Sequence, residues 1–231
     1  MRDFRVRGFQ GIPTVIKNLL IINALVFFAQ VTFENSSTIR LNDWLALHDL
    51  HSQFFKFHQL FTYMFMHGSI GHIFFNMFAL WMFGSELENV WGPKRFLLFY
   101  ISCGVGAGLL HLGVLYFEFQ AAIDQLPFLS LEKQQETISA IHYSTTIGAS
   151  GSVFGCLAAF GYLFPNNVLY IYALFPIKVK WFVILYAAAE LWMGISNSAG
   201  DNVAHWAHLG GALVGIIMVI YWNKTNRRQF Y

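Results

Sequence analysis

A serine in a run of small residues is the first candidate for chemistry in this sequence. Ser150 is the third residue of the run Gly-Ala-Ser-Gly-Ser-Val-Phe-Gly at 148–155, which opens an apolar segment with the character of a membrane span. A serine hydroxyl is a weak nucleophile until a base takes its proton, and histidine is the usual base because its pKa lies near neutrality. His208 lies in another apolar segment. We therefore predict a Ser-His dyad for acyl transfer.

Other hydrolytic and metal motifs fit these residues less well. The nucleophile-elbow pattern Gly-x-Ser-x-Gly is not met, because Ser152 occupies the position of its second glycine. His205 and His208 are three residues apart, and His67 and His72 are five apart, but no His-Glu-x-x-His pattern occurs. We therefore expect neither a metal nor another cofactor.

Composition places the candidate residues in a membrane protein. Apolar residues make up 56% of the 231 residues and charged residues only 11%, against about 25% charged in an average soluble domain. A helix needs about 20 apolar residues to cross the hydrocarbon core. Six stretches of about this length lie at 15–33, 60–84, 96–119, 146–164, 179–195 and 203–222. The predicted fold is an all-α membrane protein of one domain, with six transmembrane helices in a compact bundle.

The distribution of basic residues predicts the orientation, because lysine and arginine are retained on the cytoplasmic side. With the N-terminus inside, eleven of them fall on the inner side: Arg2, Arg5, Arg7, Lys17, Lys94, Arg95, Lys178, Lys180, Lys224, Arg227 and Arg228. Three fall outside: Arg40, Lys56 and Lys133. We expect both termini in the cytoplasm, a basic tail at 1–14, a six-span domain at 15–222 and a second tail at 223–231.

The same distribution bears on partners and location. Because the basic residues serve orientation, the net charge of +2 gives no indication of nucleic-acid binding. No organelle-targeting segment precedes the first span, so we expect a bacterial-type plasma membrane with the candidate site toward its outer side.

Residue counts place the two candidate residues at a similar depth. Ser150 is about four residues into the fourth span and His208 about five residues into the sixth. At 1.5 Å per residue these positions correspond to depths of ~6 Å and ~7.5 Å. Both spans run from outside to inside in the predicted topology, so the two side chains could meet.

Glycine spacing gives the fourth and sixth spans a reason to touch. Gly151 and Gly155 are four residues apart, and so are Gly211 and Gly215. Such Gly-x-x-x-Gly faces let helix backbones approach closely. His208 precedes Gly211 and Gly215 by three and seven residues and shares their helical face, so we expect it to point toward the fourth span.

The second span carries polar groups that could stabilise a transition state. His67, His72 and Asn76 all fall within it, and His72 and Asn76 are four residues apart, on one face of a helix. Interhelical hydrogen bonding is one interpretation. The other is an oxyanion site, in which His72, Asn76 and the Ser150 amide donate to the developing negative charge.

No aspartate within a span completes a triad. Asp201 precedes the sixth span and is interpreted as a solvated turn residue. Glu190 lies well inside the fifth span, and we expect only an interhelical bond for it.

The connections carry little that predicts chemistry. The loop at 34–59 is rich in apolar residues and either enters the outer interface or packs on the protein as a surface helix. The segment 84–95 contains Gly92-Pro93 and is interpreted as a turn that stops the second span. The segment 118–145 is interpreted as a connection. Cys103 and Cys156 fall inside spans, where a disulfide is not expected.

These motifs together resemble the rhomboid family of intramembrane serine proteases. The resemblance rests on Gly148-Ala149-Ser150-Gly151, on Ala207-His208-Leu209-Gly210-Gly211 with Gly215, and on His67, His72 and Asn76, in three separate spans. It implies a Ser150 nucleophile, a His208 base and an oxyanion site of His72, Asn76 and the Ser150 amide. It also implies that Phe154 stacks on His208 and that His67 supports the first loop or holds water.

One position departs from the family pattern. Rhomboids tend to carry a Trp-Arg pair ahead of the second span, where this chain has His58-Gln59. The anchoring of the first loop is therefore left open.

The resemblance implies cleavage of single-span membrane proteins in the lipid bilayer. It also implies a lateral gate formed by the fifth span, with Trp192, and by a cap loop at 196–202. Two other classes of function predict different sequence features. A catalytically silent relative that binds membrane clients would generally lack Ser150 or His208, and a small transporter would spread its polar groups across the bilayer. The sequence sets neither the natural substrate nor the oligomeric state.

Overall fold

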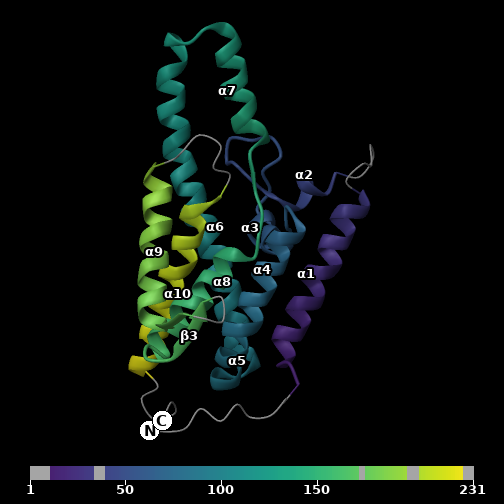
Figure 1. Ribbon diagram of the computed structural model, residues 1–231. Helices are drawn as coiled ribbons and strands as arrows, with labels where there is room; N and C mark the ends of the chain where they lie inside the picture. The colour runs from purple at the N-terminus through teal and green to yellow at the C-terminus, as the bar shows by residue number, and fades with distance from the viewer. Residues whose placement is uncertain (1–10, 34–39, 172–174, 197–202, 226–231) are drawn as a thin grey trace.

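The computed structural model describes residues 11–33, 40–171, 175–196 and 203–225. Most of the expected tail at 1–14, the end of the tail at 223–231, Asp201 and nearly all of the expected cap loop lie outside the described residues. The described chain is mostly helical (Figure 1).

Four described helices are long and apolar enough to cross a membrane by length and composition. They are α1 (Thr14–Phe33), α6 (Pro93–Gln125), α9 (Val179–Ser196) and α10 (His205–Thr225). A fifth apolar helix, α8 (Ser150–Leu163), is shorter, with 14 residues. These helices make the chain a multi-pass membrane protein.

The predicted second span is not one helix. It contains α3 (Gln59–Thr62), a 3-10 turn η1 (Tyr63–Phe65), α4 (Ile70–Ala79) and a π-helical turn η2 (Leu80–Gly84). Helical structure is interrupted after η1, where Ser69 adopts an extended conformation and its side chain accepts a hydrogen bond from the His72 amide. This N-cap starts α4 only at Ile70. The prediction that His67 lies on the same helix as His72 and Asn76 was therefore wrong.

The predicted inner turn at 84–95 is also mostly helical. Helix α5 (Ser85–Trp91) continues from η2 and ends at Gly92, whose φ of 79° favours glycine. Pro93 then begins α6, where its missing N–H costs nothing. The carboxylate of Glu88 accepts hydrogen bonds from the amides of Val15 and Ile16 at 3.0 and 2.9 Å, which caps the start of α1.

The predicted connection at 118–145 is a helical hairpin. Helix α6 continues to Gln125 and is followed by a 3-10 turn η3 (Leu126–Phe128) and by α7 (Leu131–Tyr143), which begins with Ser130 as its N-cap. The hairpin projects beyond the other helices in Figure 1. A short strand β2 (Thr145–Thr146) then pairs antiparallel with β1 (Leu47–His48) of the first loop.

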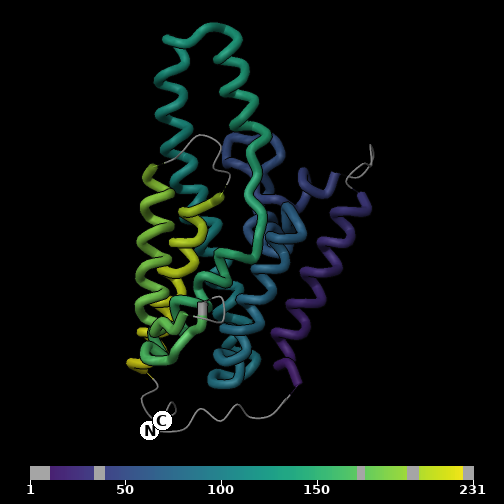
Figure 2. The backbone as a smooth tube through the Cα atoms, viewed as in Figure 1, coloured from purple at the N-terminus to yellow at the C-terminus, as the bar shows by residue number. Residues whose placement is uncertain are grey.

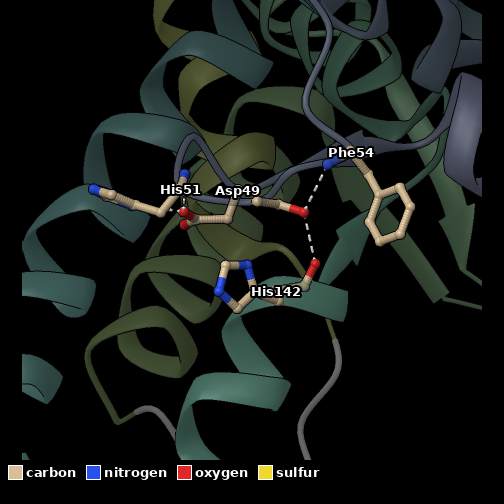
Figure 3. A network of polar contacts seen from close by, with 5 residues as sticks. Asp49, His51, Phe54 and His142 are labelled. Atoms are coloured by element: carbon tan, nitrogen blue, oxygen red, sulfur yellow. Dashed lines mark hydrogen bonds and ion pairs between the residues drawn. The ribbon is translucent and has the colours of Figure 1, made fainter.

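The first loop packs on this hairpin rather than lying free. It contains a short helix α2 (Leu41–Leu45) before β1. Ser52 Oγ donates a hydrogen bond to the His142 carbonyl at 2.7 Å, and His51 Nδ1 contacts Asp49 Oδ1 at 2.7 Å (Figure 3). The His51 ring stacks on Phe119 with centroids 3.6 Å apart.

Helix α10 packs against α8, α6 and α9 and lies beside α9 in Figure 2. A two-stranded hairpin of β3 (Val168–Ile171) and β4 (Phe175–Lys178) joins α8 to α9. Helix α9 buries only Val179 and Glu190 among its residues, so it is the most peripheral neighbour of α10.

Candidate active site

The hydroxyl of Ser150 and the imidazole of His208 are in hydrogen-bond contact. Ser150 Oγ lies 2.8 Å from His208 Nε2, although the residues are 58 positions apart in the chain. Ser150 is the first residue of α8 and His208 the fourth residue of α10. The predicted contact is present, but Ser150 begins its helix instead of lying four residues inside it. Gly148, with φ of 136°, makes the turn that allows this start.

Close backbone contact between α8 and α10 brings the two side chains together. A methyl group on Gly211 would overlap the carbonyl oxygen of Gly151, and one on Gly215 would come within 2.9 Å of the Gly155 carbonyl oxygen. The two Gly-x-x-x-Gly faces therefore pack on each other, as predicted. On its other side, a methyl group on Gly151 would meet the side chain of Ala107 in α6 at 2.5 Å.

The His208 ring is fixed by a parallel aromatic ring. Phe154 stacks on it with centroids 4.3 Å apart and an interplanar angle of 4°. Phe154 lies one turn after Ser150 on α8, and its other neighbour is Tyr186 of α9, with centroids 4.8 Å apart. The predicted stacking of Phe154 on His208 is present.

The other His208 nitrogen contacts Glu190, a partner that was not predicted from the sequence. Glu190 Oε2 lies 2.8 Å from His208 Nδ1 and 2.7 Å from His205 Nδ1, and all three side chains are buried. A neutral imidazole has one donor and one acceptor nitrogen. With Nδ1–H donating to the carboxylate, His208 Nε2 is left to accept from Ser150. The signal in the sequence was a carboxylate inside an apolar span, together with two histidines one turn apart.

Among the described residues, Glu190, His205 and His208 also form a group whose side chains lie close enough together to hold a metal ion. Their ligand atoms lie within 4.8 Å of one another. However, the direct contacts of 2.7 and 2.8 Å between carboxylate and imidazole are hydrogen bonds that already satisfy these atoms.

His72 lies beside Ser150 and turns a ring nitrogen toward it. A side chain at Gly148 would come within 2.9 Å of His72 Nε2 and 3.4 Å of Ser150 Oγ, so the two flank the same glycine. The amide of Gly68 donates to His72 Nδ1 at 3.3 Å. In the neutral ring the proton is therefore on Nε2, the nitrogen that faces Gly148.

Asn76 is buried on the same helix. Its side-chain nitrogen finds no hydrogen-bond partner within the described part of the chain. A buried donor left unpaired is unfavourable by about 1–3 kcal/mol.

His67 lies in the break before α4 and does not join this group of donors. Its ring is buried, with no partner for either nitrogen among the described residues, and its centroid is 5.0 Å from that of His72. Its backbone exchanges two hydrogen bonds with the side chain of Gln30 in α1. It lines a cavity of about 500 Å³ between α1, the first loop and the start of α4.

Ser152 points away from the site. Its hydroxyl is buried and donates to the Tyr100 carbonyl at 2.8 Å, so it joins α8 to α6. Cys103 and Cys156 are buried free thiols.

His58-Gln59 anchors the first loop from the start of α3, which answers the question left open by the sequence. The fully buried Gln59 side chain donates to the carbonyls of Asp43 and Phe54 at 3.2 and 2.9 Å, and its oxygen accepts from the Lys56 amide at 3.1 Å. The His58 ring contacts the Trp44 carbonyl at 2.7 Å.

A polar cavity of about 450 Å³ adjoins the site beside His205. Its walls come from the loop before α8, from α6 and from the facing ends of α9 and α10, and include Glu118, Thr146 and Trp206. His111 of α6 also lines it and contacts Thr146 Oγ1 at 2.8 Å. The cavity can hold water next to the buried histidines.

Comparison with known proteins gives a consistent family. The family model described as the Rhomboid domain matches residues 55–224. The chain is 28% identical to RHOMBOID-like protein 12, mitochondrial, of Arabidopsis thaliana over 98% of this chain and 65% of that protein. It is 24% identical to rhomboid protease AarA of Providencia stuartii over 94% of this chain and 75% of that protein.

Other relatives match over a smaller part of their length. Rhomboid protein 1, mitochondrial, of Saccharomyces cerevisiae is 28% identical over 71% of this chain and 42% of that protein. The chain thus spans less than two thirds of the length of the plant and yeast relatives. The plant and yeast relatives are both named as mitochondrial proteins. The comparisons therefore do not support the bacterial plasma membrane that was expected from the sequence.

Proposed function

This chain belongs to the rhomboid family, and we propose that it is a serine endopeptidase that hydrolyses peptide bonds in or near transmembrane segments of membrane proteins. The observation that carries the proposal is the 2.8 Å contact between Ser150 Oγ and His208 Nε2. An apolar bundle has no structural need for a serine and a histidine paired in this way, since buried polar groups are costly in a membrane.

The chemistry follows from this contact. Ser150 Oγ attacks the carbonyl carbon of the scissile bond while its proton moves to His208 Nε2. The carbon–nitrogen bond then breaks, and the proton passes from Nε2 to the leaving amine. Water attacks the acyl-enzyme with His208 again accepting a proton, and the new carboxylate leaves as Ser150 regains its own. The polar cavity beside His205 supports a supply of water.

The negative charge of the tetrahedral intermediate needs nearby donors. The proposed set is His72 Nε2–H beside Gly148, the Ser150 backbone N–H and the Asn76 side-chain nitrogen, which has no partner among the described residues. The Ser150 amide is at the N-terminus of α8, where backbone N–H groups have no partner within the helix. Each such donor contributes about 2.7–4 kcal/mol to lowering the barrier in acyl-transfer enzymes.

The proposed substrates are single-span membrane proteins that enter laterally from the bilayer. A stable helix hides its carbonyls, so the substrate must unwind near the cleavage site. Helix α9 is the proposed gate, because it buries only two residues and exposes Trp192. In the proposed topology the segment α3–α5 and helix α8 complete six spans, and both termini are cytoplasmic.

A reconstituted assay tests the proposal. The protein and single-span membrane proteins with reporter tags are placed in liposomes, and products are identified by mass spectrometry in water enriched in oxygen-18. We expect cleavage near one end of the substrate helix, with one labelled oxygen in the new carboxyl group. Ser150→Ala should abolish cleavage, and Ser139→Ala, at an exposed serine of α7 outside the site, should not. Cleavage that survives Ser150→Ala would refute the proposal, and binding without cleavage would favour the catalytically silent alternative.

A further inference from the structure

We infer that Glu190 is a positioning residue that makes the Ser-His pair a three-membered relay, in which His205 holds the carboxylate. The inference deepens the proposed function and rests on it. Glu190 does not touch the substrate. It acts through the ring of His208.

The geometry around His208 constrains the ring on three sides. Nε2 contacts Ser150 Oγ at 2.8 Å, Nδ1 contacts Glu190 Oε2 at 2.8 Å, and one ring face lies on Phe154. A carboxylate that accepts Nδ1–H selects the tautomer whose Nε2 can take the serine proton. It also stabilises the imidazolium that forms when that proton arrives. A dyad without an acid lacks both effects.

The burial of Glu190 indicates that this carboxylate has a role beyond helix packing. A buried carboxylate is costly unless its lone pairs are satisfied. Helix α9 buries only Val179 and Glu190, so most of its surface faces away from the protein while this one charged side chain turns inward. Interhelical packing alone would be served by an apolar residue at this position.

His205 explains how the carboxylate is held. It precedes His208 by three residues on α10, and its Nδ1 lies 2.7 Å from the same Glu190 oxygen. Two N–H donors on one oxygen fix the carboxylate against the face of α10 that also carries His208. We therefore assign His205 the part of orienting Glu190.

The kinetic test uses the liposome assay with variants of Glu190. Glu190→Gln keeps the volume and removes the charge, whereas Glu190→Asp keeps the charge. We expect Glu190→Gln to lower kcat by about 10²- to 10⁴-fold, by analogy with the acid of serine-protease triads, with KM within about twofold. Glu190→Asp should retain more activity than Glu190→Gln. The matched control Glu136→Gln, at an exposed residue of α7, should retain full activity.

The outcomes separate this inference from the proposed function. If Ser150→Ala abolishes cleavage while Glu190→Gln keeps wild-type kcat, the protease assignment stands and the inference is overturned. If a metal chelator abolishes cleavage by the wild type, a metal-held Glu190, His205 and His208 replaces the relay. Full activity in the presence of chelator supports the relay.

A second measurement is independent of turnover. Nitrogen-15 NMR of histidine-labelled protein in detergent distinguishes the two ring nitrogens, and the His208 signals are assigned from their loss in His208→Gln. We expect a protonated Nδ1 and an unprotonated Nε2 in the wild type. Glu190→Leu should remove this preference. An Nε2-protonated His208 in the wild type would overturn the inference, whatever the activity of the protein.

Discussion

The imidazole ring of His208 lies parallel to the phenyl ring of Phe154, with centroids 4.3 Å apart and planes 4° apart. Because the two rings stack face to face, Phe154 limits rotation of His208 about its side-chain bonds. The ring can then keep Nε2 on Ser150 while Nδ1 stays on Glu190. An apolar residue thus contributes to the orientation of a polar group.

Removal of this ring should reduce turnover more than stability alone explains. Phe154→Ala opens a cavity in the core, and such changes destabilise proteins by about 3–5 kcal/mol. Phe160→Ala is a matched control, because Phe160 is buried on the same helix and packs at a tilt against the rings of Phe83 and Phe164, away from His208. We expect the two variants to lose similar stability in thermal unfolding. Only Phe154→Ala should lose kcat, by roughly tenfold or more, since proton transfer to a positioned base contributes about 10²- to 10⁴-fold. Equal kcat in the two folded variants would contradict the role of the stack.

The backbone contact between α8 and α10 predicts a strong effect of one methyl group. Gly211→Ala places its side chain on the Gly151 carbonyl oxygen, so the helices must separate. Overpacking of this kind typically destabilises by about 1–3 kcal/mol. We expect kcat/KM to fall at least tenfold as the Ser150–His208 contact lengthens. Gly113→Ala is the control, because nothing lies within 4 Å of a side chain built there. Wild-type activity in Gly211→Ala would argue against the close approach.

Gln59 should be essential for the stability of the first loop. Gln59→Ala removes a buried amide and leaves the carbonyls of Asp43 and Phe54 and the Lys56 amide without that partner. Each buried polar group without a partner is unfavourable by about 1–3 kcal/mol. We expect a total loss of about 3 kcal/mol, the lower end of this range for three groups, in unfolding experiments and faster hydrogen exchange in the first loop. Gln53→Ala, at an exposed residue of the same loop, should change neither. Unchanged exchange in Gln59→Ala would show that the loop is held elsewhere.

The oxyanion assignment predicts a defect confined to the chemical step. Asn76→Ala removes a buried donor that has no partner among the described residues. We expect kcat to fall by about 10²- to 10³-fold, with KM nearly unchanged and with little loss of stability, since the Asn76 side-chain nitrogen makes no hydrogen bond within the described residues. Asn89→Ala, at an exposed residue of α5, is the control. A rise in KM with constant kcat would instead indicate a role in substrate binding.

The contact between Ser150 and His208 could be predicted from sequence because it depends on features within each of the two helices. Glycine spacing marks the faces on which α8 and α10 touch, and both residues lie near the same end of their helices. The predicted depths of Ser150 and His208 agreed with each other, but the predicted start of the fourth span was too early. The fourth span begins its helix at Ser150, after the turn at Gly148, and not at residue 146.

The partner of His208 could not be predicted in the same way. Which residue of α9 faces His208 depends on how α9 lies against α10, and the nearly uniform apolar surface of α9 does not mark a face. Glu190 therefore remained an unassigned carboxylate until the structure paired it with two histidines. The break before α4 was also not predicted. Hydropathy averaged over a span does not reveal that the Ser69 side chain caps α4 and so ends the helical structure before it.

The helical hairpin was missed because its helices are not marked by hydropathy. Helix α7 is polar along most of its length, and α6 continues past the apolar part of its span. Its packing on the first loop depends on pairs far apart in sequence, such as Ser52 with His142. The hydrogen bonds of His58 and Gln59 to the first loop likewise join residues that are apart in sequence, such as Gln59 with Asp43.

The most direct test of the central claim is covalent labelling of the proposed nucleophile. Purified protein is treated with a fluorophosphonate probe, and the modified residue is located by peptide mass spectrometry. Labelling should occur on Ser150, persist in Ser152→Ala and be lost in both Ser150→Ala and His208→Ala, because the hydroxyl reacts only when a base takes its proton. Labelling that survives Ser150→Ala, or that maps to Ser152, would contradict the assignment of Ser150 and His208 as the reacting pair.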